Sequence, residues 1–191
     1  HEHYNYWSLT SLKNFFKHFK LKIFRAEKIN THGGSIRIYL KNSIKHYEEK
    51  SVKKNLKEEE KFGIKNFQTY KNFGEKVYKI RENVLENINN LKKNNRNIIG
   101  YGAPAKATTA LNFFGISNQI DYVIEDNRLK HKKFIPGVKI PIISKDNIIK
   151  NNPIVLVLAW NFFDAIKKNN KELNLKFINI KDLEKKDFKF E

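Results

Sequence analysis

The sequence predicts an α/β fold whose C-terminal half is built on a mostly parallel sheet. Three observations support this prediction. Short apolar runs alternate with helical patterns between about residue 96 and residue 191, which is typical of strands joined by crossover helices. A long amphipathic helix precedes these runs, and a helix with two alternating strands comes first. With 191 residues, 40% of them hydrophobic, the chain is long enough to bury a core.

The first segment covers residues 1–42. Residues 8–20 carry leucines and phenylalanines at helical spacing, and the serine and threonine near the start are suitable N-caps. Residues 21–26 and 35–40 alternate between apolar and polar side chains, with a glycine pair between the two runs. We therefore expect a helix followed by an antiparallel pair of strands.

The second segment, residues 43–95, is polar and helical. Residues 51–61 predict a short helix that Gly63 ends. A longer helix follows, in which apolar residues at gaps of three and four form one stripe: Tyr70, Phe73, Val77, Ile80, Val84, Ile88 and Leu91. We expect a helical connector that packs on a neighbouring domain, in preference to a free coiled coil.

The third segment, residues 96–191, alternates between strands and helices and is predicted to be a separate domain. Its expected strands and helices follow one another along the chain, with strands at 97–101, 120–125, 154–159 and 176–180 and helices at 105–114 and 162–168.

The formal charge of +18 raises the question of a nucleic-acid partner. Of the 38 basic residues 33 are Lys, spread along the whole chain, whereas phosphate and base recognition usually uses Arg. Lys, Asn and Ile make up 81 of the 191 residues, and their codons are rich in A and T. We therefore expect a solvated lysine surface and no nucleic acid, since a nucleic-acid binder would have to bind DNA with steep salt dependence.

Composition excludes several other classes. The absence of Cys excludes disulfides, thiolate metal sites and Cys nucleophiles, and it fits a reducing, cytoplasmic compartment. No run of about 18 apolar residues exists, so we expect no membrane span. The chain begins at His1 without Met and without a signal-peptide pattern, and we interpret it as a fragment. The sequence gives no indication of oligomeric state.

The sharpest motif is Gly100-Tyr101-Gly102-Ala103-Pro104-Ala105-Lys106, which fits G-x-G-x-x-[GA] between a predicted strand and a predicted helix. Such a turn lets backbone N–H groups and a helix N-terminus approach a phosphate, and Lys106 adds a cation. Glu125 and Asp126 end the second strand, somewhat beyond the usual spacing for a ribose contact. The alternative is a tight strand-to-helix turn that binds nothing.

Three other groups could line a site. His1-Glu2-His3, close to Tyr6, offers a general base or metal ligands, or else ordinary surface histidines or the remnant of a purification tag. His32 precedes the glycine pair, which is most often only a turn. Trp160 and Asn161 follow a predicted parallel strand, where ligands bind in open α/β sheets, although packing and helix capping are equally good explanations.

Four phrases together resemble the S-adenosylmethionine-dependent C-methyltransferases that act on nucleotide-linked deoxysugars. They agree in order and spacing over nearly the whole chain: His1-Glu2-His3-x-x-Tyr6, His32-Gly33-Gly34-Ser35-x-Arg37, Gly100 to Lys106, and Ile120-Asp121-Tyr122 through Asp126-Asn127, Pro136-Gly137 and Ile140-Pro141-Ile142 to Trp160-Asn161. The resemblance implies the last strands of a class I methyltransferase domain, a connector and a Rossmann-like C-terminal domain. It also implies that the zinc domain and the loop for S-adenosylmethionine lie upstream, so we assign no metal ligand in this chain.

The resemblance further implies roles for particular residues. His3 matches the base that removes a proton next to the sugar's keto group, and Glu2 matches a neighbouring catalytic residue. Substrate contacts are expected at the other matched positions: Tyr6, His32, Gly100, Gly102, Lys106, Trp160 and Asn161. The chain alone is expected to be inactive. The alternative function is a non-catalytic, Rossmann-like module that binds a nucleotide sugar or a dinucleotide.

Overall fold

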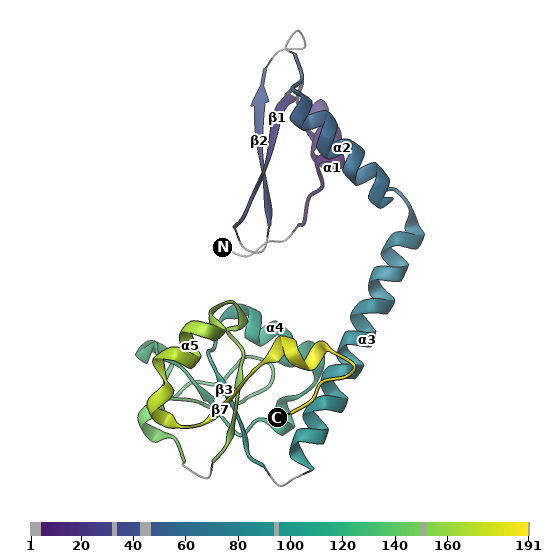
Figure 1. Ribbon diagram of the computed structural model, residues 1–191. Helices are drawn as coiled ribbons and strands as arrows, with labels where there is room; N and C mark the ends of the chain where they lie inside the picture. Colours follow the sequence, from purple (N-terminus) through teal and green to yellow (C-terminus); the bar gives the residue numbers. More distant parts are fainter. Residues whose placement is uncertain (1–4, 32–33, 43–46, 94–95, 150–151, 191) are drawn as a thin grey trace. The chain divides into compact units, whose positions relative to one another are not determined.

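The computed structural model describes most of the chain, namely residues 5–31, 34–42, 47–93, 96–149 and 152–190 (Figure 1). The chain divides into two compact units, His1–Gly74 and Glu75–Glu191. The division falls inside one long helix, within the segment that the sequence predicts to be a connector.

The first unit contains a strand hairpin and two helices. Its elements are, in chain order, α1 (Leu9–Lys17), β1 (Lys22–Ile29), β2 (Ser35–Lys41) and α2 (Lys50–Phe62). β1 and β2 are antiparallel, as predicted, and Ile29 pairs with Ser35 next to the turn. Both helices pack on the hairpin through a small core of Leu9, Ile23, Ala26 and Val52 (Figure 1).

Two sets of contacts fix the start of α1. Ser8 is the N-cap, and its hydroxyl accepts the N–H of Ser11 at 3.0 Å while the Ser11 hydroxyl accepts the N–H of Ser8. The carboxylate of Glu59, on α2, accepts the N–H groups of Leu9 and Thr10 at 2.6 and 2.8 Å. A carboxylate in this place also opposes the positive end of the helix dipole.

The helices after the hairpin end and begin close to the predicted residues. α2 ends at Gly63, which adopts a left-handed φ of +80° that favours glycine. The long helix α3 (Phe67–Lys92) follows. Val84, Ile88 and Leu91 on its predicted stripe are buried in the second unit, whereas Tyr70 and Phe73 near its start are exposed. The stripe therefore packs only over its C-terminal part.

The second unit is built on a five-stranded parallel sheet, which confirms the predicted Rossmann-like α/β fold. The strands lie in the order β5-β4-β3-β6-β7, and every neighbouring pair is parallel. They are β3 (Ile98–Tyr101), β4 (Val123–Ile124), β5 (Ile142–Ile143), β6 (Ile154–Val157) and β7 (Lys176–Asn179). β5 was not expected as a strand, since its two residues follow Pro141 and show no alternation.

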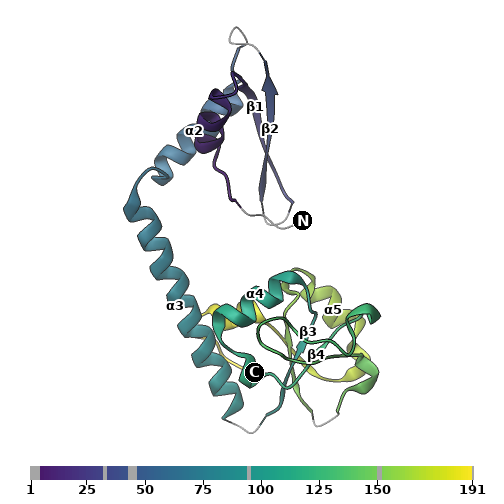
Figure 2. The same cartoon turned by 180° about the vertical axis from the view of Figure 1, so that it is seen from behind.

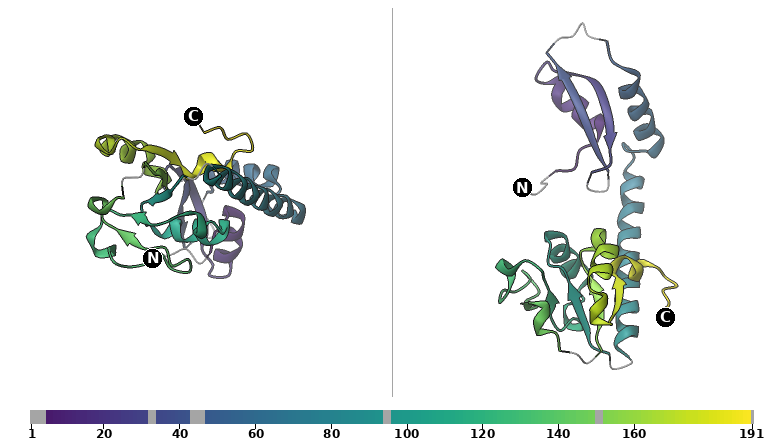
Figure 3. Two further views of the ribbon diagram at one scale, coloured as in Figure 1. Left: turned by 90° about the horizontal axis from the view of Figure 1, so that it is seen from below. Right: turned by 60° about the vertical axis from the view of Figure 1, so that its left-hand side comes forward.

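Helices cover both faces of this sheet (Figures 2 and 3). α3 and α4 (Ala105–Phe114) pack on one face, through residues such as Ile88 and Leu111. α5 (Phe163–Asn169) packs on the other face against Val155 and Val157. The central strands β3 and β6 are consequently buried on both faces, which explains their uninterrupted apolar sequences.

Candidate functional site

The ends of β3 and β6 form the centre of the candidate site. The chain leaves β3 toward α4 and leaves β6 toward α5, and these two helices lie on opposite faces of the sheet. In open α/β sheets the crevice at such a switch point is where ligands bind. The predicted Gly100–Lys106 motif and the predicted Trp160–Asn161 pair meet here, since the N–H of Leu158 donates to the carbonyl of Tyr101 at 2.9 Å.

The two motif glycines are explained by close packing. An added Cβ at Gly100 would lie 2.8 Å from a methyl carbon of Val123. At Gly102 the backbone φ is +88°, and an added Cβ would lie 2.7 Å from the Cβ of Ala159. Both glycines are buried, so they let the β3 turn lie against its neighbours.

The side chains that reach this edge come from α4 and from the turn after β6. The Nζ of Lys106 lies 5.8 Å from the centre of the Trp160 ring, within the range of a cation–π contact. Trp160 is half-buried against the core, while Lys106 and Asn161 are exposed. Asn161 is not the N-cap of α5, which is Phe162. A cation, an aromatic face and an amide are thus available to a ligand.

Glu125 fastens the glycine-rich turn. Its carboxylate accepts the N–H of Ala103 at 2.8 Å and the N–H of Asn127 at 3.0 Å. Lys130 donates to the same carboxylate at 3.3 Å and to the carbonyl of Ala103 at 3.0 Å. The sequence draws attention to Glu125 as the end of a strand, but it gives no sign of Lys130, which reaches the turn from the following loop.

A second polar group lies on the α5 side of β3. The hydroxyl of Tyr101 donates to Asp126 at 2.9 Å, and the amide of Asn170 donates to the Tyr101 oxygen at 3.2 Å. Burial, reinforced by the neighbouring Asp126, raises the pKa of Tyr101 to about 12. Sequence analysis missed this pair, because Asn170 lies 69 residues beyond Tyr101 and belongs to no motif. Tyr101 therefore remains a neutral hydrogen-bond donor at physiological pH.

The other predicted site residues belong to the first unit. Glu2, His3 and His32 lie outside the described residues. Tyr6 is exposed. An open hollow of about 630 Å³ is lined by Trp7, next to the first phrase, and by Gly34 and Ser35 of the second phrase. The structure thus brings Trp7, next to the first phrase, and two residues of the second phrase to one end of the hairpin.

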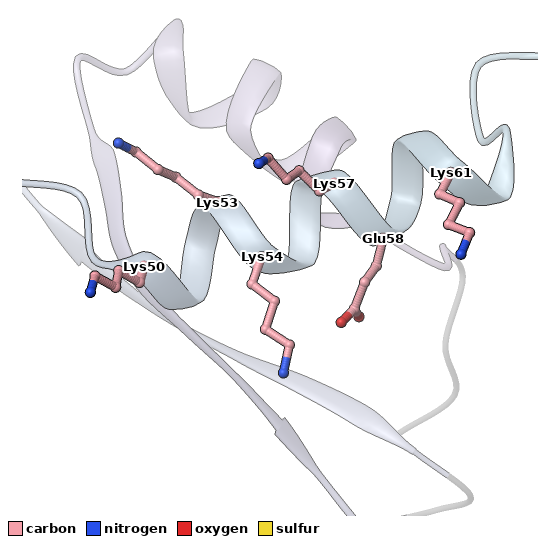
Figure 4. Close-up of a pocket in the computed structure, with 6 residues that line it drawn as sticks. All are labelled: Lys50, Lys53, Lys54, Lys57, Glu58 and Lys61. Carbon is pink, nitrogen blue, oxygen red and sulfur yellow. The ribbon is translucent and has the colours of Figure 1, made fainter.

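Helix α2 presents a basic surface (Figure 4). The side chains that line a shallow hollow on this surface all project from α2: Lys50, Lys53, Lys54, Lys57, Glu58 and Lys61. Glu58 forms an ion pair with Lys28. Lysine is abundant throughout this chain, so we assign this surface to solvent.

The described residues contain neither a metal-binding cluster nor a membrane-spanning helix. In that part of the chain no three His, Asp or Glu side chains gather in a way that would hold a metal ion. No helix there is long and apolar enough to cross a membrane.

A parallel sheet with a glycine-rich turn at its switch point defines the second unit as a Rossmann-like α/β domain. Residues 30–178 match the family described as the C-methyltransferase C-terminal domain, and this chain belongs to that family. Among curated proteins, the C-methyltransferase NovU of Streptomyces niveus is 33% identical to it over 175 residues. The match covers 90% of this chain but 42% of NovU, so the chain spans less than half of that relative's length. These comparisons confirm the resemblance to the C-terminal part of C-methyltransferases.

Proposed function

We propose that this chain acts as part of an enzyme that transfers a methyl group from S-adenosylmethionine to a carbon of a nucleotide-linked deoxysugar. The methylated carbon is the one next to the sugar's keto group. The observation that carries the proposal is the family match over residues 30–178, together with 33% identity to a C-methyltransferase in an alignment that covers 90% of the chain. The methyl donor is a second substrate, and its binding loop is expected in a part of the enzyme upstream of His1.

The proposed chemistry begins with proton removal. A carbon next to a ketone is a poor nucleophile until its C–H bond breaks, so a base must lie within hydrogen-bond reach of that proton. His3 is the proposed base, since imidazole titrates near neutral pH, and Glu2 orients it. The electron pair left on carbon then forms the new C–C bond as the bond from sulfur to methyl breaks. His3 carries the proton until solvent removes it.

The second unit is proposed to hold the nucleotide part of the substrate. The exposed Lys106 offers a cation to a phosphate, and the half-buried Trp160 offers an aromatic face to a base or sugar. Asn161 adds a donor and an acceptor. Gly100 and Gly102 contribute indirectly, by letting the backbone lie close to Val123 and to Ala159, respectively. Tyr6 and His32 stay proposed substrate contacts, on the basis of their match to the family's phrases.

A second candidate function is a non-catalytic module that binds a nucleotide sugar or a dinucleotide. The glycine-rich turn at the switch point of a parallel sheet favours this function. Under it, the histidines near the start of the chain have no chemical role, and the intact protein transfers no methyl group.

Replacing His3 in the intact enzyme tests the proposal. We expect His3→Ala to lower kcat by about 100-fold or more, as loss of a general base does, with little change in KM for the sugar nucleotide. When the methyl donor is left out, the enzyme should exchange the substrate's C–H hydrogen for deuterium from D₂O, which NMR detects. His3→Ala should also lose this exchange. His18→Ala is the control, since His18 is an exposed histidine at the end of α1. An unchanged kcat in His3→Ala would remove His3 from the mechanism.

A further inference from the structure

The glycine-rich turn differs from a phosphate-binding turn in one respect. Such turns hold phosphate through backbone N–H groups that have no partner within the protein. Here the N–H of Ala103, the first donor after Gly102, is already bonded to Glu125 Oε2 at 2.8 Å. A carboxylate of the protein therefore occupies the place where the turn would meet an anionic ligand.

The Glu125 carboxylate is held firmly in this place. Its Oε1 accepts the N–H of Asn127 at 3.0 Å, and Lys130 lies 3.3 Å from its Oε2. The Glu125 side chain is only 12% exposed. Burial alone would raise its pKa, but the N–H groups of Asn127 and Ala103 and the charge of Lys130 outweigh burial and hold the pKa below its usual range. The group is therefore an anion at neutral pH.

The cation beside the turn is also engaged. The Nζ of Lys130 donates to the carbonyl of Ala103 at 3.0 Å as well as to Glu125. A diphosphate in the turn would have to displace Glu125 from Ala103, take over Lys130 and leave a carboxylate buried beside a phosphate. Like charges at such short distances repel strongly where water is largely excluded.

We propose that Glu125 determines the ligand specificity of this turn by acting as an internal anion that excludes the diphosphate of free nucleotides and dinucleotides. Lys130 is its counter-ion. A phosphate that binds at this edge does so outside the turn, at Lys106. This inference does not depend on methyl transfer, because it concerns which ligands bind at the turn and not the reaction that follows binding.

Binding of ADP and NAD⁺ to the 191-residue chain, followed by calorimetry and amide NMR, tests the proposal. We expect no saturable binding at the turn up to about 1 mM for the unmodified chain, because Glu125 already holds the Ala103 N–H and would repel the phosphates. Glu125→Ala frees the Ala103 N–H and Lys130, so ADP should bind at least about tenfold more tightly, with a shift of the Ala103 amide signal. Adding Lys130→Ala should abolish the gain.

Asp121→Ala is the matched control, since Asp121 is an exposed carboxylate just before β4, the strand that Glu125 follows. The proposal is wrong if Glu125→Ala increases the affinity for ADP no more than Asp121→Ala does. It is equally wrong if the unmodified chain binds ADP with a Kd below about 100 μM, roughly −5.5 kcal/mol, and with a shift at Ala103.

A measurement on the unmodified chain keeps the test independent of how the variants fold. The amide proton shifts of Ala103 and Asn127 should titrate together in acid, because one carboxylate accepts both N–H groups. Their common midpoint should lie below the ordinary range for Glu. An Ala103 signal that stays unchanged over the pH range in which the Asn127 signal titrates would overturn the assignment.

Discussion

Gly102 shows how a single residue supports two different explanations of a motif. Its φ of +88° favours glycine, and a Cβ at this position would lie only 2.7 Å from the Cβ of Ala159. The sequence pattern alone suggested that a phosphate approaches this glycine, whereas the structure brings the neighbouring turn against it. Both explanations demand glycine, so only the surrounding contacts distinguish them.

Replacing Gly102 with Ala should destabilise the second unit by about 2 kcal/mol or more, through backbone strain and overlap with Ala159. Gly74 is the matched control: it lies inside α3, and an added Cβ there meets nothing within 4 Å. Gly74→Ala should stabilise the chain by about 0.5–1 kcal/mol. Urea unfolding followed by circular dichroism measures both changes. Shifts of the same sign in both variants would contradict this account.

At the scale of elements, the start of α1 depends on a residue of another helix. Glu59 accepts the N–H groups of Leu9 and Thr10 and also the Thr10 hydroxyl at 2.6 Å. Three donors that would otherwise need water thus meet one carboxylate. Formation of α1 is thereby coupled to formation of α2.

Glu59→Ala should lower the free energy of unfolding of the first unit by about 1–3 kcal/mol, because charge-assisted cap hydrogen bonds are lost. Glu60→Ala is the control, since Glu60 is exposed on the same helix and carries the same helix propensity. Its effect should stay within about 0.5 kcal/mol. Trp7, close to α1, reports the transition by fluorescence once Trp160 is replaced with Phe. Equal effects of the two substitutions would exclude the cap.

The predicted features depend on residues that are close in sequence, whereas the missed features depend on residues that are far apart in sequence. Ser8 and Gly63 mark helix ends through contacts within a few residues. The sequence pattern located Gly63 and gave Ser8 as one of two possible N-caps. The role of Glu59 depends on a residue fifty positions away, which periodicity does not reveal. β5 is similar, because Ile142 and Ile143 become a strand only through their pairing with β4.

In the candidate site, too, features set by local sequence were predicted and features set by distant contacts were missed. The motif located the turn after β3 and the pair after β6, because strand ends carry local signals. It did not reveal that Glu125 fills the turn, since that fact depends on the distance between two loops. Nor did it reveal the contact between Tyr101 and Asn170 on the α5 side of the sheet.

On the scale of the whole molecule, the two units differ in their capacity to fold alone. The second unit has a five-stranded sheet with a core on each face. The first has two strands and a core of four buried residues. Two-stranded sheets with little buried surface are marginal in water.

Residues 75–191 should therefore fold as an independent domain, with a cooperative urea transition and a dispersed amide spectrum, whereas residues 1–74 alone should lack a cooperative transition. Circular dichroism and NMR of the two separate pieces provide the measurement. A non-cooperative transition for 75–191 would contradict the division of the chain into these units.

The order of strands in the sheet has a consequence during protein synthesis. β3 lies at the centre of the sheet and all four of its residues are buried, yet it leaves the ribosome first among the five strands. Its partner β6 begins 53 residues after β3 ends. At 5–20 residues per second, one edge of β3, with its unpaired N–H and C=O groups and its apolar side chains, waits roughly 3–10 s for this partner. The interval in which residues 102–153 are translated is therefore when the nascent second unit is most exposed to aggregation.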